Sequence, residues 1–93
     1  MTEKELLALL AEEETMEYGF RLLVKSYGDR LCEHIMRMVN NREDANDVLQ
    51  NTLVKTYRGL SSFKGNSRLY TWLYRIATNE ALSHLARQKR RFA

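Results

Sequence analysis

The side chains between residues 63 and 91 have the chemistry that single-stranded nucleic acid requires. They combine cations that can neutralise phosphates, tyrosines that can stack on unpaired bases, and amide or hydroxyl groups that can hydrogen-bond to base edges. The basic end of this segment is formed by four residues: Arg87, Lys89, Arg90 and Arg91. Because phosphate contacts carry no sequence information, this basic end alone predicts weak binding without specificity.

Formal charge divides the chain into two unlike halves. Residues 1–47 contain six Lys or Arg and eleven Asp or Glu, a charge of −5. Residues 48–93 contain nine basic residues and one acid, Glu80, a charge of +8. A half with this excess is a candidate phosphate-facing surface, although a basic run is also typical of ordinary solvated surface. The second half therefore indicates the class of partner.

Enzyme chemistry finds little support in the sequence. The two histidines, His34 and His84, have no acid, thiol or second ligand at a spacing typical of a catalytic or metal site, and we expect His34 to be a surface or packing residue. The single cysteine, Cys32, cannot form an internal disulfide and has apolar neighbours, so we expect a buried, inert thiol. We predict no catalytic residue, metal, cofactor or small-molecule substrate.

Length and composition predict one small all-α domain. The 93 residues suffice for a single modest core, and 44% hydrophobic residues, four glycines and no proline favour a compact bundle of about four helices. No apolar run approaches the roughly 20 residues of a membrane span, and the acidic beginning lacks the basic start of a signal peptide. We therefore expect a cytoplasmic protein without membrane contact.

Capping residues and glycines predict where the helices begin and end. Thr2 can cap a first helix over residues 1–14, whose acidic end we expect at the surface, and Thr15 can start a second. The step at residues 27–29 is expected to bend or interrupt that second helix. Asn40 and Asn41 then stop it, and Asn41 can cap the next helix, which begins near residue 42.

Two helices carry apolar residues at intervals of three and four. The expected buried stripe of the third comprises Ala45, Val48, Leu49, Thr52, Leu53 and Tyr57. The expected stripe of the long basic last helix comprises Leu69, Trp72, Leu73, Ile76, Ala77, Ala81, Leu82 and Leu85. We expect Asn66 or Ser67 to cap this last helix and interpret Trp72 as a core residue.

Three separate blocks resemble the second conserved region of extracytoplasmic-function sigma factors, members of the sigma-70 family of RNA polymerase subunits. The blocks are Asp44–Thr52 with Tyr57-Arg58, Phe63–Ser67, and Thr71–Asn79. They occur in the family's order and spacing, and the resemblance extends over residues 18–91. It implies a transcription initiation factor domain, not an enzyme.

For the helix over residues 42–58, the resemblance implies docking on the clamp helices of core RNA polymerase. The residues it assigns to this contact are Asp44, Asp47, Gln50 and Asn51. Short acidic and amide side chains on one helix face can pair with arginines of a partner helix, which makes the assignment chemically reasonable. The alternative for these four residues is ordinary capping and solvation.

For the rest of the chain, the resemblance implies recognition and melting of the promoter minus-10 element through the non-template strand. The loop over residues 63–67 would receive a flipped base, its alternative being a plain turn between helices. The helix over residues 68–91 would melt and read the promoter. The DNA-binding residues so assigned are Phe63, Lys64, Gly65, Asn66, Ser67, Tyr70, Tyr74, Arg75, Thr78, Asn79, Arg87, Lys89, Arg90 and Arg91.

Some features depart from the family or leave alternatives open. Complete members carry a second helical domain that reads the minus-35 element, and its absence here argues against promoter selection by these 93 residues alone. Residues 1–14 match little and keep an uncertain role. A nucleic-acid-binding module outside transcription is one alternative. Another is a protein-interaction domain, for which the family implies an anti-sigma factor as partner.

Overall fold

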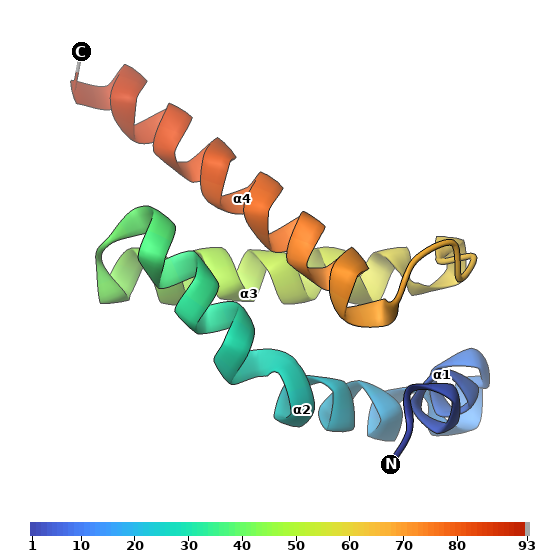
Figure 1. Ribbon diagram of the computed structural model, residues 1–93. Helices are drawn as coiled ribbons and strands as arrows, with labels where there is room; N and C mark the ends of the chain where they lie inside the picture. The colour runs from blue at the N-terminus through green and yellow to red at the C-terminus, as the bar shows by residue number, and fades with distance from the viewer. Residues whose placement is uncertain (93) are drawn as a thin grey trace.

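The computed structural model describes residues 1–92, and these form an all-α bundle (Figure 1). Its elements in chain order are α1 (Glu3–Ala11), α2 (Glu13–Val39), α3 (Arg42–Gly59), the short 3-10 helix η1 (Leu60–Ser62) and α4 (Leu69–Phe92). No strand occurs in residues 1–92, which confirms the predicted fold class; residue 93 lies outside the described part. Within that range, no helix is both long enough and apolar enough to cross a bilayer.

Two of the predicted helix starts are confirmed by their capping hydrogen bonds. The Thr2 hydroxyl accepts the Glu5 N–H at 3.2 Å, and the Glu5 carboxylate accepts the Thr2 N–H at 2.9 Å. These bonds from the backbone and side chain of Thr2 lower the pKa of Glu5. Asn41 Oδ1 accepts the Asp44 N–H at 2.9 Å, directly after Asn40 ends α2 in the left-handed region at a φ of 57°.

The prediction for the start of the second helix was wrong. Helix α2 begins at Glu13, and the Thr15 hydroxyl donates to the Leu9 carbonyl of α1 at 2.6 Å. This bond satisfies an α1 carbonyl that has no partner within its own helix. Of the two outcomes expected at residues 27–29, the interruption is excluded, since α2 is continuous there, and the helix axis does change direction along its length (Figure 1).

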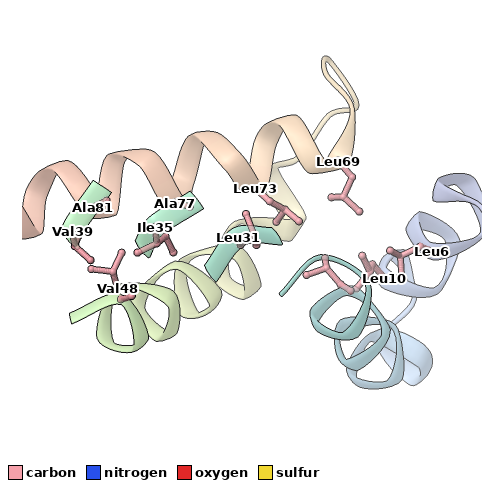
Figure 2. Packing of buried hydrophobic residues seen from close by; sticks show 12 residues of the cluster. Leu6, Leu10, Leu31, Ile35, Val39, Val48, Leu69, Leu73, Ala77 and Ala81 are labelled. Carbon is pink, nitrogen blue, oxygen red and sulfur yellow. The ribbon is translucent and has the colours of Figure 1, made fainter. Parts of the chain in front are cut away.

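One hydrophobic core joins all four helices, and α2 is at its centre because it packs against each of the others. Figure 2 shows the side chains of this core pointing inward from α1 at one end to the second half of α4 at the other. Its fully or nearly buried members are Leu6, Leu10, Leu23, Leu31, Ile35, Val39, Ala45, Val48, Leu69, Leu73, Ala77 and Ala81. Cys32 is only half-buried, against expectation.

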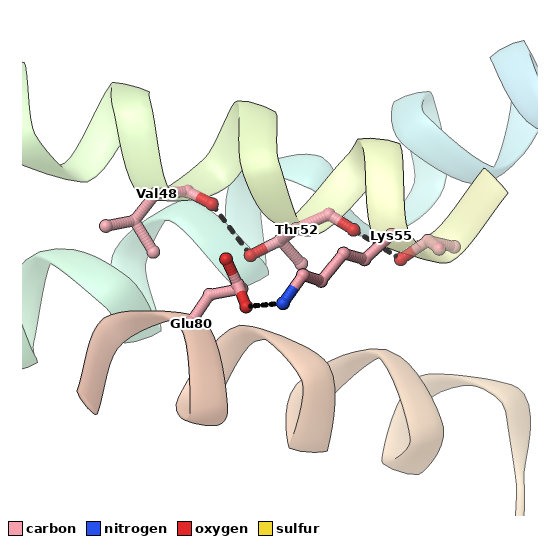
Figure 3. Close-up of polar contacts among 5 residues, drawn as sticks. Val48, Thr52, Lys55 and Glu80 are labelled. Atoms are coloured by element: carbon pink, nitrogen blue, oxygen red, sulfur yellow. Dashed lines mark hydrogen bonds and ion pairs between the residues drawn. The ribbon is translucent and has the colours of Figure 1, made fainter. Parts of the chain in front are cut away.

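The buried face of α3 is more polar than its predicted stripe. Thr52 and Thr56 are fully buried, and each hydroxyl donates to the carbonyl four residues earlier, at 2.8 Å (Figure 3). These bonds remove the cost of burying a free hydroxyl. Tyr57, which the periodicity predicts in the core, is 46% exposed and meets Phe20 edge-on at 5.2 Å between ring centroids. The buried position is therefore Thr56, one residue earlier in the helix than the periodicity predicts.

A buried carboxylate joins α4 to α3. Glu80, the single acid of the basic half, is only 7% exposed and forms an ion pair with Lys55 (Figure 3). The lysine side chain itself is largely solvent-accessible. Because the lysine reaches in from the surface, the carboxylate is compensated without burial of a second full charge.

Helix α4 begins later than predicted and leaves one predicted core residue exposed. Its first residue is Leu69, whose N–H donates to Glu3 Oε1 of α1 at 3.2 Å, so neither Asn66 nor Ser67 caps it. Leu82 is 53% exposed although it continues the apolar spacing. Its neighbour Ala81 is buried, and Leu85, further along the helix, packs against the core, so Leu82 is exposed because it lies on another side of α4 and not because the helix has left the bundle.

Candidate nucleic-acid interface

The segment between η1 and α4 is a loop whose polar members face solvent. Gly65 adopts a φ of 74°, a conformation that side chains rarely tolerate, and an added Cβ would meet nothing within 4 Å. The glycine is thus required by backbone conformation and not by crowding. Lys64 and Asn66 are exposed, whereas Ser67 is half-buried and donates its hydroxyl to the Arg68 carbonyl at 3.3 Å.

An open pocket of about 220 Å³ lies between this loop and the first turns of α4. It is lined by Ser62, Phe63, Lys64, Asn66, Ser67, Trp72 and Arg75. Four of the five loop residues assigned from sequence therefore surround one cavity, together with one cation of α4. The lining offers an aromatic edge, amide and hydroxyl groups and two positive charges, which are the groups that hold a base and its phosphate.

Trp72 belongs both to the hydrophobic core and to the lining of the loop pocket. It packs against the hydrophobic core, as expected, but it is only half-buried and also forms a wall of the loop pocket. Its ring lies 4.9 Å from the Phe63 ring between centroids, and a Cβ added to Gly59 would be 3.1 Å from Trp72 Cζ2. The tryptophan is therefore held between the end of α3 and the loop, which fixes the shape of the pocket.

One face of the exposed Tyr74 ring stacks on a histidine of α2. The His34 and Tyr74 rings stack with centroids 3.8 Å apart, and His34 Nε2 lies 2.7 Å from Thr78 Oγ1. Because the Thr78 hydroxyl donates to the Tyr74 carbonyl at 2.9 Å, it accepts from His34, which places the proton of the neutral ring on Nε2. Burial, reinforced by the positive charge of Arg37, lowers the pKa of His34.

Replacing His34 with glutamine is expected to reduce the pH dependence of stability below about pH 6.5. The lowered pKa means that unfolded chains bind a proton more readily than folded ones, so the wild-type free energy of unfolding falls as the pH drops from about 6.5 through the folded pKa. Urea unfolding at pH 7.5 and at pH 5.5 measures the difference. His84→Gln is the matched control, and an equal effect in both variants would contradict the role of His34.

The remaining assigned residues on the first half of α4 differ in accessibility. Arg75 and Asn79 are exposed, and Arg75 lines the loop pocket. Tyr70 is half-buried and contacts the Tyr27 ring of α2, with 5.4 Å between centroids. The Arg30 guanidinium lies 4.7 Å from the centre of the Tyr70 ring. The exposed side of α4 that carries Tyr74, Arg75 and Asn79 is its open face. This open face is bordered by α2 on one side and by the loop on the other.

The basic end of α4 is fully accessible. Arg87, Lys89, Arg90 and Arg91 are all exposed, and their helix continues past the body of the bundle (Figure 1). The last polar link to the body is Gln88, whose amide donates to Asp44 Oδ2 at 2.8 Å. The four cations therefore project from a continuous helix, in a geometry that suits contact with a phosphate backbone.

The four residues assigned to polymerase contact do not lie in one environment. Asp47, Gln50 and Asn51 are exposed on one face of α3, where Val54 is also exposed. Asp44 is half-buried. Its carboxylate accepts the Gln88 amide, and His84 Nε2 lies 3.4 Å from it at an angle that makes no hydrogen bond. Three of the four are thus free for a partner, and Asp44 is committed to α4.

Sequence reasoning missed three contributors to this surface: Tyr27, Arg30 and the support from His34. The spacing of Tyr27, Arg30 and His34 along α2 places them on one helix face, which was the available signal. Which helix that face meets could not be read from it. Within residues 1–92, no group of three or more His, Cys, Asp and Glu side chains is arranged to hold a metal ion.

Residues 23–91 match the sequence model of the sigma-70 region 2 family. This match covers well over half of the chain. The chain belongs to the sigma-70 region 2 family. Sigma factors are transcription initiation factors and not enzymes, in agreement with the prediction from sequence.

Curated relatives of this sigma-70 region 2 domain are themselves sigma factors. The chain is 46% identical over 73 residues to the RNA polymerase sigma-H factor of Pseudomonas aeruginosa and to the ECF RNA polymerase sigma-E factors of Haemophilus influenzae and Escherichia coli K12. The aligned part is 78% of this chain but 38% of each relative. The chain therefore spans well under half the length of the curated relatives it matches.

A solved structure extends the similarity to nearly the whole domain. It is the NMR structure of an engineered region 2 of sigmaE in complex with GTAAAA, with a TM-score of 0.85 and 36% sequence identity. The match covers 98% of this chain and 93% of that one. The resemblance to extracytoplasmic-function sigma factors inferred from the three sequence blocks is thereby confirmed.

Proposed function

We propose that this domain recognises and melts a promoter minus-10 element by holding its non-template strand on α4 and in the loop pocket. The observation that carries the proposal is the loop pocket, formed by residues between 62 and 75, because the groups that line it suit a base. The solved structure to which this chain is similar is a complex with GTAAAA. A domain acting in this way works in the cytoplasm, where promoter DNA and polymerase are.

The geometry suggests how strand separation is stabilised. A base leaving the duplex loses a few kcal/mol of stacking and pairing, and stacking on an aromatic side chain returns about 1–3 kcal/mol. Tyr74, firmly backed by His34, offers such a face, and the loop pocket offers enclosure for one base. Arg75 and the basic end of α4 supply phosphate contacts that set register.

Asn66→Ala and Asn79→Ala are expected to reduce discrimination between sequences more than total affinity. Both amides are exposed beside the pocket or on the open face of α4, where they can hydrogen-bond to base edges. Removing one such hydrogen bond typically costs about 1–3 kcal/mol for the preferred base. Fluorescence anisotropy with a panel of hexadeoxynucleotides that includes GTAAAA and the permuted AATAGA measures the effect.

The matched control for these amides is Asn46→Ala, an exposed asparagine on α3 away from the pocket. We expect it to leave the whole panel unchanged. A uniform loss across all hexanucleotides in the Asn66 and Asn79 variants would show that they contact only the backbone. A wild-type protein that binds every member of the panel equally would argue for a general nucleic-acid module or a purely protein-binding role.

We further propose that the exposed face of α3 binds core RNA polymerase. Asp47, Gln50 and Asn51 present short polar side chains beside the apolar Val54, the mixture expected of a helix that docks on a partner helix. Asp44 contributes less directly, because its carboxylate is held by Gln88. An anti-sigma factor that covered this face or α4 would compete with the same contacts.

Asp47→Ala/Gln50→Ala is expected to weaken binding to core polymerase at least tenfold while leaving the free energy of unfolding within about 1 kcal/mol of wild type. Both side chains leave the bundle surface, and substitutions at such positions usually change stability by less than about 0.5 kcal/mol. Pull-down and surface plasmon resonance with core polymerase provide the measurement. Glu13→Ala/Glu17→Ala on exposed α2 positions is the control, and unchanged binding by the α3 variant would contradict the assignment.

A further inference from the structure

We propose that His34 and Thr78 form a positioning pair, which fixes the Tyr74 ring as a platform for one base while neither residue touches the DNA. This inference rests on the proposed function and explains how its stacking surface is held. It also changes the role of Thr78. The family resemblance assigns this residue to DNA contact, whereas its contacts indicate a residue that acts through Tyr74.

The hydroxyl of Thr78 has no proton left for a base. It donates to the Tyr74 carbonyl at 2.9 Å and accepts from His34 Nε2 at 2.7 Å. A hydroxyl carries a single proton, so Thr78 can donate to a base edge only by breaking its bond to Tyr74. Thr78 is also half-buried, unlike Arg75 and Asn79 on the same helix, which are exposed. Its hydroxyl is therefore committed to contacts within the protein.

The bond from His34 distinguishes Thr78 from other threonines of the bundle. Thr52 and Thr56 also donate to the carbonyl four residues earlier, but their hydroxyls form no second hydrogen bond within residues 1–92. An intrahelical bond of this kind is a common local feature of threonine in helices. The contact with His34 spans 44 residues of sequence and joins α2 to α4. It therefore ties the turn of α4 that carries Tyr74 to a fixed point on α2.

The stack holds the tyrosine ring itself. The His34 and Tyr74 ring centroids are 3.8 Å apart with 22° between the planes, so one face of the tyrosine is covered. His34 is only 8% exposed and lies between the fully buried Leu31 and Ile35 along α2, which leaves it little room to move aside. Tyr74 remains 41% exposed, so a base can reach its other face. A ring held in this way loses little further side-chain freedom when a base stacks on it.

A positioning pair has a distinctive effect on binding energy, because it contributes only through Tyr74. Replacing a residue that contacts the DNA weakens binding whether or not Tyr74 is present. Replacing a residue that only holds Tyr74 weakens binding in the wild type and has no effect once Tyr74 is alanine. A double-mutant cycle separates the two cases, since residues that act through one contact are not additive.

The test combines this cycle with a fluorescent base. The probe is the hexadeoxynucleotide that the wild-type domain prefers in the panel, with 2-aminopurine in place of one base at each position in turn. Stacking on an aromatic ring quenches 2-aminopurine fluorescence, so Tyr74→Ala identifies the position that lies on Tyr74. We expect His34→Leu and Thr78→Val to reduce quenching at that position alone and to weaken binding about fivefold and about threefold. In Tyr74→Ala, the same two substitutions should change affinity by less than about 1.5-fold.

Two variants control for the loss of a hydroxyl and of a histidine. Thr56→Val removes the same kind of hydroxyl bond from α3, and His84→Leu replaces a histidine that lies beside Asp44. We expect both to leave quenching at the Tyr74 position unchanged. Thr78→Ser keeps the hydroxyl and is expected to restore wild-type quenching and affinity.

Circular dichroism at the assay temperature verifies that each variant is folded. If His34→Leu does not fold, Thr78→Val and Thr78→Ser still decide the question, because they leave the histidine in place.

Three results would overturn the pair, and they differ in what they imply. If quenching at the Tyr74 position is unchanged in His34→Leu and Thr78→Val, Tyr74 holds its own position and the proposed function stands without the pair. If Thr78→Val weakens binding equally with and without Tyr74, Thr78 contacts the strand directly. If the wild-type protein prefers no hexanucleotide in the panel, the proposed function fails and the pair fails with it.

Discussion

Replacing Arg87, Lys89, Arg90 and Arg91 with glutamine is expected to abolish most of the affinity for single-stranded DNA. The four side chains are exposed on the projecting end of α4, so each can neutralise a phosphate. For single strands, the slope of log K against log salt falls by about 0.7 for every phosphate that is no longer neutralised, which predicts a reduction approaching about 3. At physiological salt, affinity is expected to fall roughly 100-fold or more if all four side chains bind phosphates.

Anisotropy titrations between about 50 and 200 mM salt measure this slope. The matched control removes four exposed cations elsewhere, at Lys4, Arg21, Lys25 and Arg58, and changes the net charge equally. We expect the control to lower the slope far less, because none of those residues lies on α4 or lines the loop pocket. Equal slopes in the two variants would show that net charge, and not the end of α4, attracts the DNA.

Leu73→Ala is expected to destabilise the domain by about 2–5 kcal/mol, because it opens a cavity where α4 meets α2. Leu73 is 0% exposed and lies beside Leu31 and Leu69 in the core (Figure 2). For a domain of this size, the loss corresponds to a fall in melting temperature of roughly 10–25 °C. Thermal unfolding followed by circular dichroism gives the value.

Leu82→Ala is the matched control for that cavity. The same substitution on the same helix removes the same atoms, but from a side chain that is 53% exposed. We expect a change within about 0.5 kcal/mol, since alanine also has the higher helix propensity. Similar losses for Leu73 and Leu82 would mean that the side of α4 that carries Leu82 packs against something in solution.

Local signals in the sequence predicted the helices well. Thr2 and Asn41 act through hydrogen bonds to N–H groups three residues away, and Asn40 acts through its own φ, so no distant part of the chain is involved. Where a distant group intervened, prediction failed. The first N–H of α4 is satisfied by Glu3, 66 residues earlier, and not by the adjacent Asn66 or Ser67.

Hydrophobic periodicity predicted which face of each helix is apolar but not what covers it. Leu73 and Leu82 fit the same stripe, yet only Leu73 has α2 opposite it. In α3 the buried positions include Thr56 in place of Tyr57, and burial of this threonine is tolerated because its hydroxyl bonds to its own helix. Glu80 is buried because Lys55 of α3 reaches it.

The sequence by itself determined the all-α class, the order of the helices, the charge division and the sigma-70 region 2 family, because all of these depend on residue type and short-range spacing. Only the tertiary structure placed Trp72 in the wall of a pocket, His34 beneath Tyr74, and Arg30 against Tyr70. The contacts of His34 and Arg30 join α2 to α4, which are far apart in the chain, and depend on how these two helices cross. The place of Trp72 depends on how the loop returns α4 against the end of α3, and no local pattern encodes either arrangement.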